Sequence, residues 1–375
     1  MKHRSAMAKV AFAHTFAVSC ALCLGATVPG AAADSVPETT RKVVLEKAGD
    51  GQEGFRWNLV EAPVPAFGAD QVLVRVRAVA LNRGDVEMML PKYGRAGLVI
   101  GSDAAGDVVA VGRDVKDLRP GDRVTNTYFE NWTDGPPSDE KMAQAFGTSI
   151  DGVFAEYVVL PQTAVIAAPK NLSYEEAATL PTAGLTAWMA VNGHRELRAG
   201  DVVVVQGTGG VSVLALQFAK ALGARVIATS SSDEKLKQVK ALGAQHGINY
   251  RTMPSWSSHV FVLTDRHGAD VVVDVGGKSS LAESARSLAP WGTISVVGGL
   301  TGYDGEIPAI DLIMKTARAQ GIYVGSRADF RRMNGFIAQR DFHPHVDRVF
   351  DLKDYQAAAG HMQSGNFVGK IVLKL

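Results

Sequence analysis

A glycine-rich turn between a strand and a helix constrains this chain more than any other segment. Residues 202–212 read VVVVQGTGGVS, in which four valines predict a buried strand and the residues after the turn predict a helix. Gly207 suits a sharp turn, and Gly209 lets the backbone approach a pyrophosphate held at the positive helix N-terminus. Ser212 stands where a third glycine is usual, but its small hydroxymethyl group leaves the phosphate site intact. The segment predicts a dinucleotide site formed by Gly207, Thr208, Gly209, Gly210 and Val211.

The end of the next predicted strand indicates which dinucleotide binds. In NAD sites a carboxylate about twenty residues after the turn holds the ribose hydroxyls. Here Ser230, Ser231 and Ser232 stand at that place. The repulsion between a carboxylate and a 2′-phosphate is therefore missing, and Lys235 supplies a positive charge one turn later. We expect NADPH in preference to NADH; the alternative is that these residues only cap the helix that follows.

Two hydrophobic patterns divide the chain. Residues 41–125 alternate apolar and polar positions, as half-buried strands do, and residues 126–150 lose this pattern and predict a polar loop or insertion. From about residue 170, strands rich in Val and Ile alternate with helices, which indicates a parallel sheet covered on both faces. A length of 375 residues suits two domains. The sequence predicts an α/β protein in which a Rossmann-type doubly wound parallel sheet accompanies a β-rich domain.

The first 33 residues differ in kind from the rest. Basic residues precede an apolar stretch and a small-residue site that ends at Ala33, a pattern typical of a secretory signal peptide (1–33). It predicts a periplasmic or secreted protein without a membrane span in the mature chain. The alternatives are a start set too far upstream, or an apolar tail on a cytoplasmic protein. Cys20 and Cys23 are the two cysteines of the chain, and both lie in this segment. Removal of the signal peptide therefore leaves no cysteine for a disulfide or a thiolate metal site.

The charge balance argues against nucleic-acid binding. The 39 basic and 38 acidic residues give a formal net charge of +1. Without residues 1–33 there are 36 basic against 38 acidic residues, a net charge of −2. Neither value produces the basic field that nucleic acids attract, so we expect a small molecule as the partner of the site.

Six motifs follow one another in an order known from one family. They are DAAGDVVAVG (103–112), PGDRV, GVFAEY, LPTAGLTAW, GTGGV and, near the C-terminus, GKIVL. With this combination the chain resembles the medium-chain dehydrogenase/reductase superfamily, and within it the zinc-free branch related to quinone oxidoreductases. The resemblance implies a GroES-like catalytic domain built from residues 34–163 and 321–375. It also implies that the NADP-binding Rossmann domain, residues 164–320, is inserted between these two parts.

Zinc-dependent members of the superfamily hold a catalytic metal with cysteine, histidine and glutamate. The matching positions of this chain carry Asn82, Ser102, Asp103 and Thr182. The four cysteines of the structural zinc site are also missing. Because Zn²⁺ is bound by thiolate and imidazole groups, we expect no zinc. His343 and His345 are expected to be surface or structural residues.

Without a metal, hydride addition to a conjugated carbonyl is the reduction that needs the fewest stabilising groups from the protein. The carbonyl of a quinone or enone delocalises the charge, so hydrogen-bond donors near the oxygen and a proton source suffice. Family relatives imply that Asn82, Asp85 and Tyr93 line the cleft beside the nicotinamide. Tyr93 is the candidate donor to the substrate oxygen, or else only an aromatic wall. Asn82 would orient the substrate, and Asp85 is expected to bond backbone groups.

The same resemblance implies further cofactor contacts. On the nicotinamide side they are Thr186, Val297, Gly298 and Gly299. Tyr250 is expected to close over the adenosine phosphate alongside Lys235. Lys370 either reaches the phosphates or is an ordinary edge-strand lysine.

Oligomeric state is a further implication of the resemblance. Relatives commonly dimerise by pairing the sheet edge of the cofactor domain, so we expect a homodimer with residues 321–326, GIYVGS, as the pairing strand. Burial of this segment in a monomer would explain its apolar residues equally well.

Two other functions fit the same residues. One is a metal-free alcohol dehydrogenase or aldehyde reductase that keeps the fold and the cofactor. The other is a cofactor-binding protein without relevant turnover, with a structural or redox-sensing role. The intact glycine turn favours an enzyme.

Overall fold

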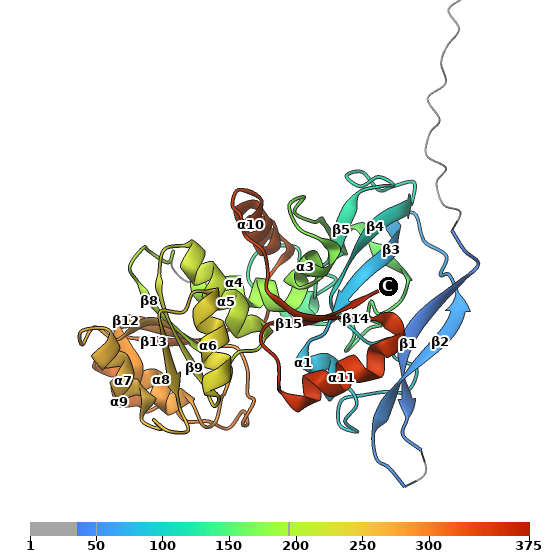
Figure 1. Ribbon diagram of the computed structural model, residues 1–375. Helices are drawn as coiled ribbons and strands as arrows, with labels where there is room; N and C mark the ends of the chain where they lie inside the picture. The colour runs from blue at the N-terminus through green and yellow to red at the C-terminus, as the bar shows by residue number, and fades with distance from the viewer. Residues whose placement is uncertain (1–35, 50, 194–195) are drawn as a thin grey trace, which may run out of the picture. The chain divides into compact units, whose positions relative to one another are not determined.

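Two large β-sheets carry the fold of the computed structural model, which describes residues 36–49, 51–193 and 196–375 (Figure 1). Both sheets belong to one unit, Pro37–Leu375. The expected signal peptide, 1–33, with its two cysteines, lies outside the described residues. Within these described ranges no helix is long and apolar enough to cross a membrane.

The first sheet has seven strands and joins the beginning and the end of the unit. Its order is β14-β15-β3-β4-β5-β7, and β6 pairs with β3. The bounds are β3 Gln71–Ala80, β4 Ala104–Val111, β5 Arg123–Asn126, β6 Tyr157–Pro161, β7 Val165–Ala167, β14 Val346–Asp351 and β15 Lys370–Lys374. β15 runs antiparallel to β3, with Val372 opposite Ala80. A separate antiparallel pair consists of β1 Thr39–Lys47 and β2 Phe55–Pro63.

The second sheet is parallel and has six strands in the order β10-β9-β8-β11-β12-β13. The bounds are β8 Val202–Gln206, β9 Arg225–Ser230, β10 His246–Asn249, β11 Ala269–Asp274, β12 Leu288–Val296 and β13 Arg318–Gly321. Counted along the chain, this order is 3-2-1-4-5-6, the order of dinucleotide-binding folds. The order reverses at β8, so the carboxyl end of β8 is the topological switch point, where ligands bind in such sheets.

Helices cover both faces of the second sheet (Figure 1). The described α-helices are α1 Arg83–Glu87, α2 Asp139–Met142, α3 Tyr174–Ala178, α4 Leu185–Asn192, α5 Gly210–Ala221, α6 Asp233–Leu242, α7 Trp256–Leu263, α8 Leu281–Ser287, α9 Ala309–Ile313, α10 Arg327–Ala338 and α11 Tyr355–Ser364. The valines of β8 explain why both faces of this sheet need to be covered. Val203 and Val205 join the core with residues of α4 and α5, whereas Val202 and Val204 join a second core with residues of α7 and α8. The expected α/β fold, a doubly wound sheet beside a GroES-like β-domain, is confirmed.

The helix expected from Ser173 onward is interrupted. Ser173 caps α3, because its side chain accepts a hydrogen bond from Glu176 N, but α3 ends at Ala178. Residues Leu180–Gly184 then form one π-helical turn before α4 begins. Pro181 is the physical cause, because proline lacks the N–H that a continuous helix needs and its ring clashes with the preceding turn.

The prediction of a polar loop at residues 126–150 is wrong in part. Tyr128, Phe129 and Trp132 are buried in the core that α4 and α5 share. The ring centroids of Phe129 and Trp132 lie 5.7 Å apart. Their separations of three and four residues would suit a helix, but residues 128–132 form neither a helix nor a regular strand, so the pattern of the sequence does not reveal their burial.

The edge strand of the parallel sheet lies earlier than expected. β13 ends at Gly321, and the chain from Ile322 to Ser326 continues without strand pairing. The prediction that 321–326 forms the edge strand is therefore wrong: Val324, Gly325 and Ser326 are buried, and the exposed edge is β13 itself.

Candidate functional site

The glycine-rich turn lies at the switch point with open space beside it. Gly207 has a φ of +72°, a value that favours glycine, and Gly209 stands directly before α5. In the described chain, a β-carbon added to either glycine would meet nothing within 4 Å beyond its immediate neighbours. The protein itself therefore leaves room next to the N–H groups at the start of α5. This arrangement fits a pyrophosphate.

Two hydrogen bonds fasten the turn to its surroundings. Ser212 Oγ donates to the carbonyl oxygen of Gln206 at 2.6 Å, so the serine that replaces the third glycine ties the start of α5 to the end of β8. Gly369 N donates to the carbonyl oxygen of Thr208 at 2.9 Å. The dinucleotide turn is thereby joined to the C-terminal strand of the other sheet.

Gly210 is required by a close approach of Lys370. A β-carbon on Gly210 would lie 2.5 Å from Lys370 Cδ, because the lysine stem crosses the first turn of α5. Val211 follows in the same turn and is partly exposed. Packing of the lysine stem therefore sets the identity of the residue at this point of the turn.

The residues expected at the adenosine end come together at the carboxyl ends of β9 and β10. Ser230 Oγ accepts from Ser232 N at 3.2 Å, and Ser232 Oγ accepts from Lys235 N at 3.3 Å. The capping interpretation is thus confirmed at Ser232. The backbone N–H of Tyr250 donates to the carbonyl oxygen of Ser230 at 3.1 Å. Lys235 Nζ donates to the carbonyl oxygen of Gly365, and burial lowers the pKa of this lysine.

The residues expected beside the nicotinamide follow β12. Val297 N donates to the carbonyl oxygen of Asp274 at 2.8 Å, and Val297 and Gly298 line a cavity. A β-carbon on Gly299 would lie 2.9 Å from the carbonyl oxygen of Gly302, a backbone contact that favours glycine there. Thr186 is buried in the first turn of α4.

The four residues that the resemblance matches to zinc-ligand positions belong to one polar cluster. Asn82 Nδ2 donates to Ser102 Oγ at 3.0 Å, and Thr182 Oγ1 donates to Asp103. Lys370 Nζ donates to Asn82 Oδ1 at 2.6 Å and lies 3.6 Å from Asp103 Oδ2. The side chains of Lys370 and Asp103 are 2% and 0% exposed. Four segments distant in sequence therefore meet in this cluster, and two of them, at Asn82 and Asp103, contact the ammonium group of Lys370 directly.

Neither interpretation of Lys370 from the sequence anticipated this position. β15 lies between β14 and β3, so the prediction of an edge-strand lysine is wrong. The ammonium also donates to the carbonyl oxygen of Leu81 at 2.7 Å. Its hydrogen bonds are therefore made within the cluster and not at the glycine turn. Burial lowers the pKa of Lys370 and raises the pKa of Asp103, while the attraction between the two opposes both shifts.

The donor set of this cluster does not fit a zinc ion. Amide and hydroxyl groups replace the thiolate and imidazole ligands that zinc selects, and the one carboxylate, Asp103, already contacts Thr182 and Lys370. In the part of the chain that the structure describes, no group of three or more His, Cys, Asp or Glu side chains could hold a metal. His343, which contacts Glu176 at 2.8 Å, belongs to an exposed ion-pair group.

Asp85 has the structural role expected of it. Its Oδ2 accepts from Asn82 N at 2.6 Å and holds the first turn of α1. Burial raises the pKa of Asp85 to about 7, and the nearby carboxylate of Asp103 adds to the rise.

Tyr93 lies at the surface. It is 45% exposed, and Lys92 Nζ lies 5.1 Å from the centroid of its ring. It is not among the residues that line the cavity described next. Its assignment as donor stays a prediction.

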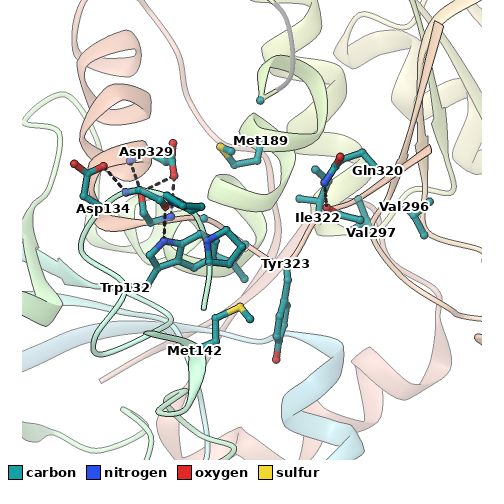
Figure 2. A pocket seen from close by; sticks show the side chains of 18 of the residues that line it. Trp132, Asp134, Met142, Met189, Val296, Val297, Gln320, Ile322, Tyr323 and Asp329 are labelled. Carbon is teal, nitrogen blue, oxygen red and sulfur yellow. Dashed lines mark hydrogen bonds between the residues drawn. The ribbon is translucent and has the colours of Figure 1, made fainter. Parts of the chain in front are cut away.

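A cavity of about 710 Å³ opens beside Val297 and Gly298 (Figure 2). Its walls come from the 132–142 segment, from α4 and from residues 320–326. Sequence reasoning missed this site, because two of the three walls are segments without regular periodicity. Its signal in the sequence was the aromatic content of 126–150, which a solvated polar loop does not need.

Two tyrosines connect this cavity to the region of Asp85. Tyr323 lines the cavity, and its hydroxyl oxygen lies 3.3 Å from that of Tyr128. Tyr128 is buried, and burial raises its pKa above the ordinary value, with smaller contributions from Tyr323 and Asp85. Each tyrosine stands two residues after the end of a strand, β5 or β13.

Comparisons with known proteins cover most of the chain. A family model for the alcohol dehydrogenase GroES-like domain matches residues 68–170, and one for zinc-binding dehydrogenases matches residues 210–339. A zinc-type alcohol dehydrogenase-like protein of Schizosaccharomyces pombe is 42% identical over 315 residues, which cover 81% of this chain and 91% of the relative. Quinone oxidoreductase-like protein 2 of Mus musculus is 29% identical over 84% of this chain and 87% of its own.

A solved structure shows the same arrangement. A protein from Sinorhizobium meliloti 1021, assigned as an alcohol dehydrogenase, is 40% identical and superposes with a TM-score of 0.85 over 91% of this chain and 100% of its own. The relatives include zinc-type and quinone oxidoreductase-like proteins, so they agree on the superfamily and not on the branch. With a GroES-like domain, a six-stranded parallel sheet and a dinucleotide turn at its switch point, this chain belongs to the medium-chain dehydrogenase/reductase superfamily of NAD(P)-dependent oxidoreductases.

Proposed function

We propose that the protein is an NADPH-dependent reductase that transfers hydride to a quinone, enone or related conjugated carbonyl without zinc. The observation that carries the proposal is the buried ammonium of Lys370 between Asn82 and Asp103. A fixed positive charge opposes a second cation at short range. Without a Lewis acid to stabilise an alkoxide, a substrate that delocalises its own charge is favoured.

The preference for NADPH is supported by the carboxyl end of β9. Hydroxyl groups of Ser230, Ser231 and Ser232 stand where an NAD site has a carboxylate. Lys235 adds a cation, and its hydrogen-bond partner is the neutral carbonyl group of Gly365. A 2′-phosphate would therefore meet the ammonium of Lys235 beside these hydroxyl groups, while the carboxylate of Asp233 at the start of α6 accepts from Asn249 Nδ2 at 2.9 Å.

The tyrosine pair supplies the hydrogen bond that the reaction needs. When bound, the reduced nicotinamide supplies the hydride. The substrate carbon takes the hydride with its electron pair, the π electrons move to the carbonyl oxygen, and a proton from solvent completes the reduction. The hydroxyl oxygens of Tyr128, which is buried, and Tyr323 lie 3.3 Å apart, and either could donate to the other. We propose that Tyr128 donates, which leaves the hydrogen of Tyr323 to stabilise the developing oxyanion. Tyr93 stays the alternative donor.

Oxidation of NADPH in the presence of different acceptors tests the proposal. A quinone, an enone and an aldehyde are offered in turn, with NADPH and with NADH, and the metal content of the same preparation is measured. We expect turnover of the quinone or the enone, with NADPH preferred, and no loss after chelation. Activity that requires stoichiometric zinc would contradict the proposal.

Two results would favour the other functions. Turnover of the aldehyde alone would indicate a metal-free alcohol dehydrogenase or aldehyde reductase. Tight NADPH binding without turnover of any acceptor would indicate a cofactor-binding protein.

A further inference from the structure

The cavity beside Val297 has the position of a substrate pocket. Val297 and Gly298 form one side of it, at the strand end where the nicotinamide is expected, and Tyr323 forms another (Figure 2). Its volume of about 710 Å³ falls within the range of small-molecule sites, roughly 300–1,000 Å³. The nicotinamide would fill the part of the cavity next to Val297, and the remainder is space for a large substituent of the substrate.

The walls of the cavity are largely apolar. The side chains that set its character are Trp132, Pro136, Pro137, Met142, Met189 and Ile322. Aromatic and thioether groups pack well against flat or irregular hydrocarbon, because they are polarisable and adapt to shape. These walls fit an aromatic ring or a branched alkyl group.

The charges of the lining exclude an anionic ligand. Arg332, the one basic residue among the described lining residues, pairs with Asp329. Asp329 in turn accepts from Ser326 N at 2.9 Å in the capping box that begins α10. Both charges of this ion pair therefore already have partners within the protein. Asp134 adds a carboxylate at the rim. A phosphate or carboxylate in the cavity would meet negative charge and no free cation.

The cavity is preformed, because its irregular wall is held in place. Trp132 Nε1 donates to the carbonyl oxygen of Gly135 at 2.9 Å. The carbonyl oxygens of Trp132 and Thr133 accept from Arg327 N and Ala328 N, at the start of α10, at 2.9 and 3.0 Å. A wall ordered in this way does not need ligand binding to form, which lowers the entropy cost of binding.

We infer that this cavity binds the large, uncharged, apolar substituent of the substrate, such as an aryl or branched alkyl group. The inference rests on the proposed function and narrows it: the substrates are bulky enones or quinones whose large substituent carries no phosphate or carboxylate.

A filled-cavity variant tests the inference by kinetics. Met142→Trp, in the wall, is compared with Val262→Trp on the exposed face of α7 as a control. For wild type we expect kcat/KM for benzylideneacetone to exceed that for methyl vinyl ketone, and 4-carboxybenzylideneacetone, which carries a carboxylate on the same ring, to be a poor substrate. Met142→Trp should lower the ratio of kcat/KM for benzylideneacetone to that for methyl vinyl ketone by about 10-fold or more, and Val262→Trp should leave this ratio unchanged. Equal loss for both ketones in Met142→Trp, or reduction of the carboxylate derivative as efficient as that of benzylideneacetone, would overturn the inference.

A binding measurement without catalysis separates this inference from the proposed function. Benzylacetone, the saturated ketone, is titrated while tryptophan fluorescence is recorded for wild type and for Trp132→Phe. We expect a saturable change in wild type that is lost in Trp132→Phe and weakened in Met142→Trp. This result would stand even if no enone were reduced. If benzylacetone leaves the Trp132 signal unchanged, the cavity assignment is wrong, whatever the enzyme reduces.

Discussion

Lys370 links the two halves of the site at the scale of a single residue. Its stem crosses the start of α5 at Gly210, and its ammonium ends between Asn82 and Asp103. Removal of one partner of a buried ion pair leaves the other charge without compensation. The lysine is therefore a structural cation as well as the group that opposes a metal.

Replacement of this lysine by methionine should be strongly destabilising. We expect Lys370→Met to lower the free energy of unfolding by about 3–5 kcal/mol, because Asp103 is left buried and unpaired. Urea denaturation measures the loss. The added substitution Asp103→Asn should recover much of it, and Lys374→Met, at the exposed end of the same strand, is the control. A Lys370→Met protein as stable as the control would contradict the assignment.

Asp85 should make the stability of the protein depend on pH. Its pKa of about 7 in the fold exceeds the ordinary value of 3.8, so the folded state binds more protons than the unfolded state between these values. The free energy of unfolding that Asp85 contributes should therefore fall as pH rises from about 4 to about 7, and change little above that. In Asp85→Asn, which still accepts from Asn82 N, this slope should be absent. Thermal denaturation of both proteins from pH 4.5 to 7.5 checks this, and parallel curves would refute it.

At the scale of elements, local chemistry made the dinucleotide turn predictable. The valines of β8, Gly207 and Gly209 determine it within one short segment, and the structure has the expected strand, turn and helix. The break before α4 also has a local cause, Pro181, but the helical pattern on both sides of this proline predicts one continuous helix. The buried Tyr128 and the burial of Lys370 depend on segments far away in sequence, so no local pattern could give them.

Two neighbouring glycines of the turn should respond oppositely to alanine. At Gly209, where φ is −73° and the added β-carbon meets open space, alanine should leave the melting temperature almost unchanged but weaken NADPH binding by about 10-fold or more, because the methyl group enters the pyrophosphate site. At Gly210 the methyl group would clash with the stem of Lys370, so alanine should cost about 1–3 kcal/mol of stability. Calorimetry and thermal denaturation separate the two effects. Equal effects of both variants would show that the turn has another role.

At the scale of the whole molecule, the exposed edge of the second sheet predicts self-association. All four residues of β13 are exposed, and Ile310, Ile313 and Met314 are exposed in the segment before it. An open strand edge flanked by apolar side chains is a template for pairing with another chain. We therefore keep the homodimer as a proposal and move its pairing strand to β13.

Light scattering should find a dimer at micromolar concentration. Ile313→Asp should shift it toward the monomer, because a carboxylate would be buried against the partner, whereas Val262→Asp, on α7, should not. A monomeric wild-type protein would refute the proposal.

The leader expected at residues 1–33 is a separate prediction for the full chain. If the signal peptide is used, N-terminal sequencing of the protein recovered from cells should begin at Asp34 and fractionation should find it outside the cytoplasm. Recovery of a chain that begins at Met1 in the cytoplasm would reject export and support the alternative.

The position of β15 has a consequence for proteolysis. Residues Lys370–Lys374 lie between β14 and β3, and the N–H of Gly369 beside them donates to the dinucleotide turn. A protease cut within this strand would therefore disrupt the seven-stranded sheet and the coenzyme turn together.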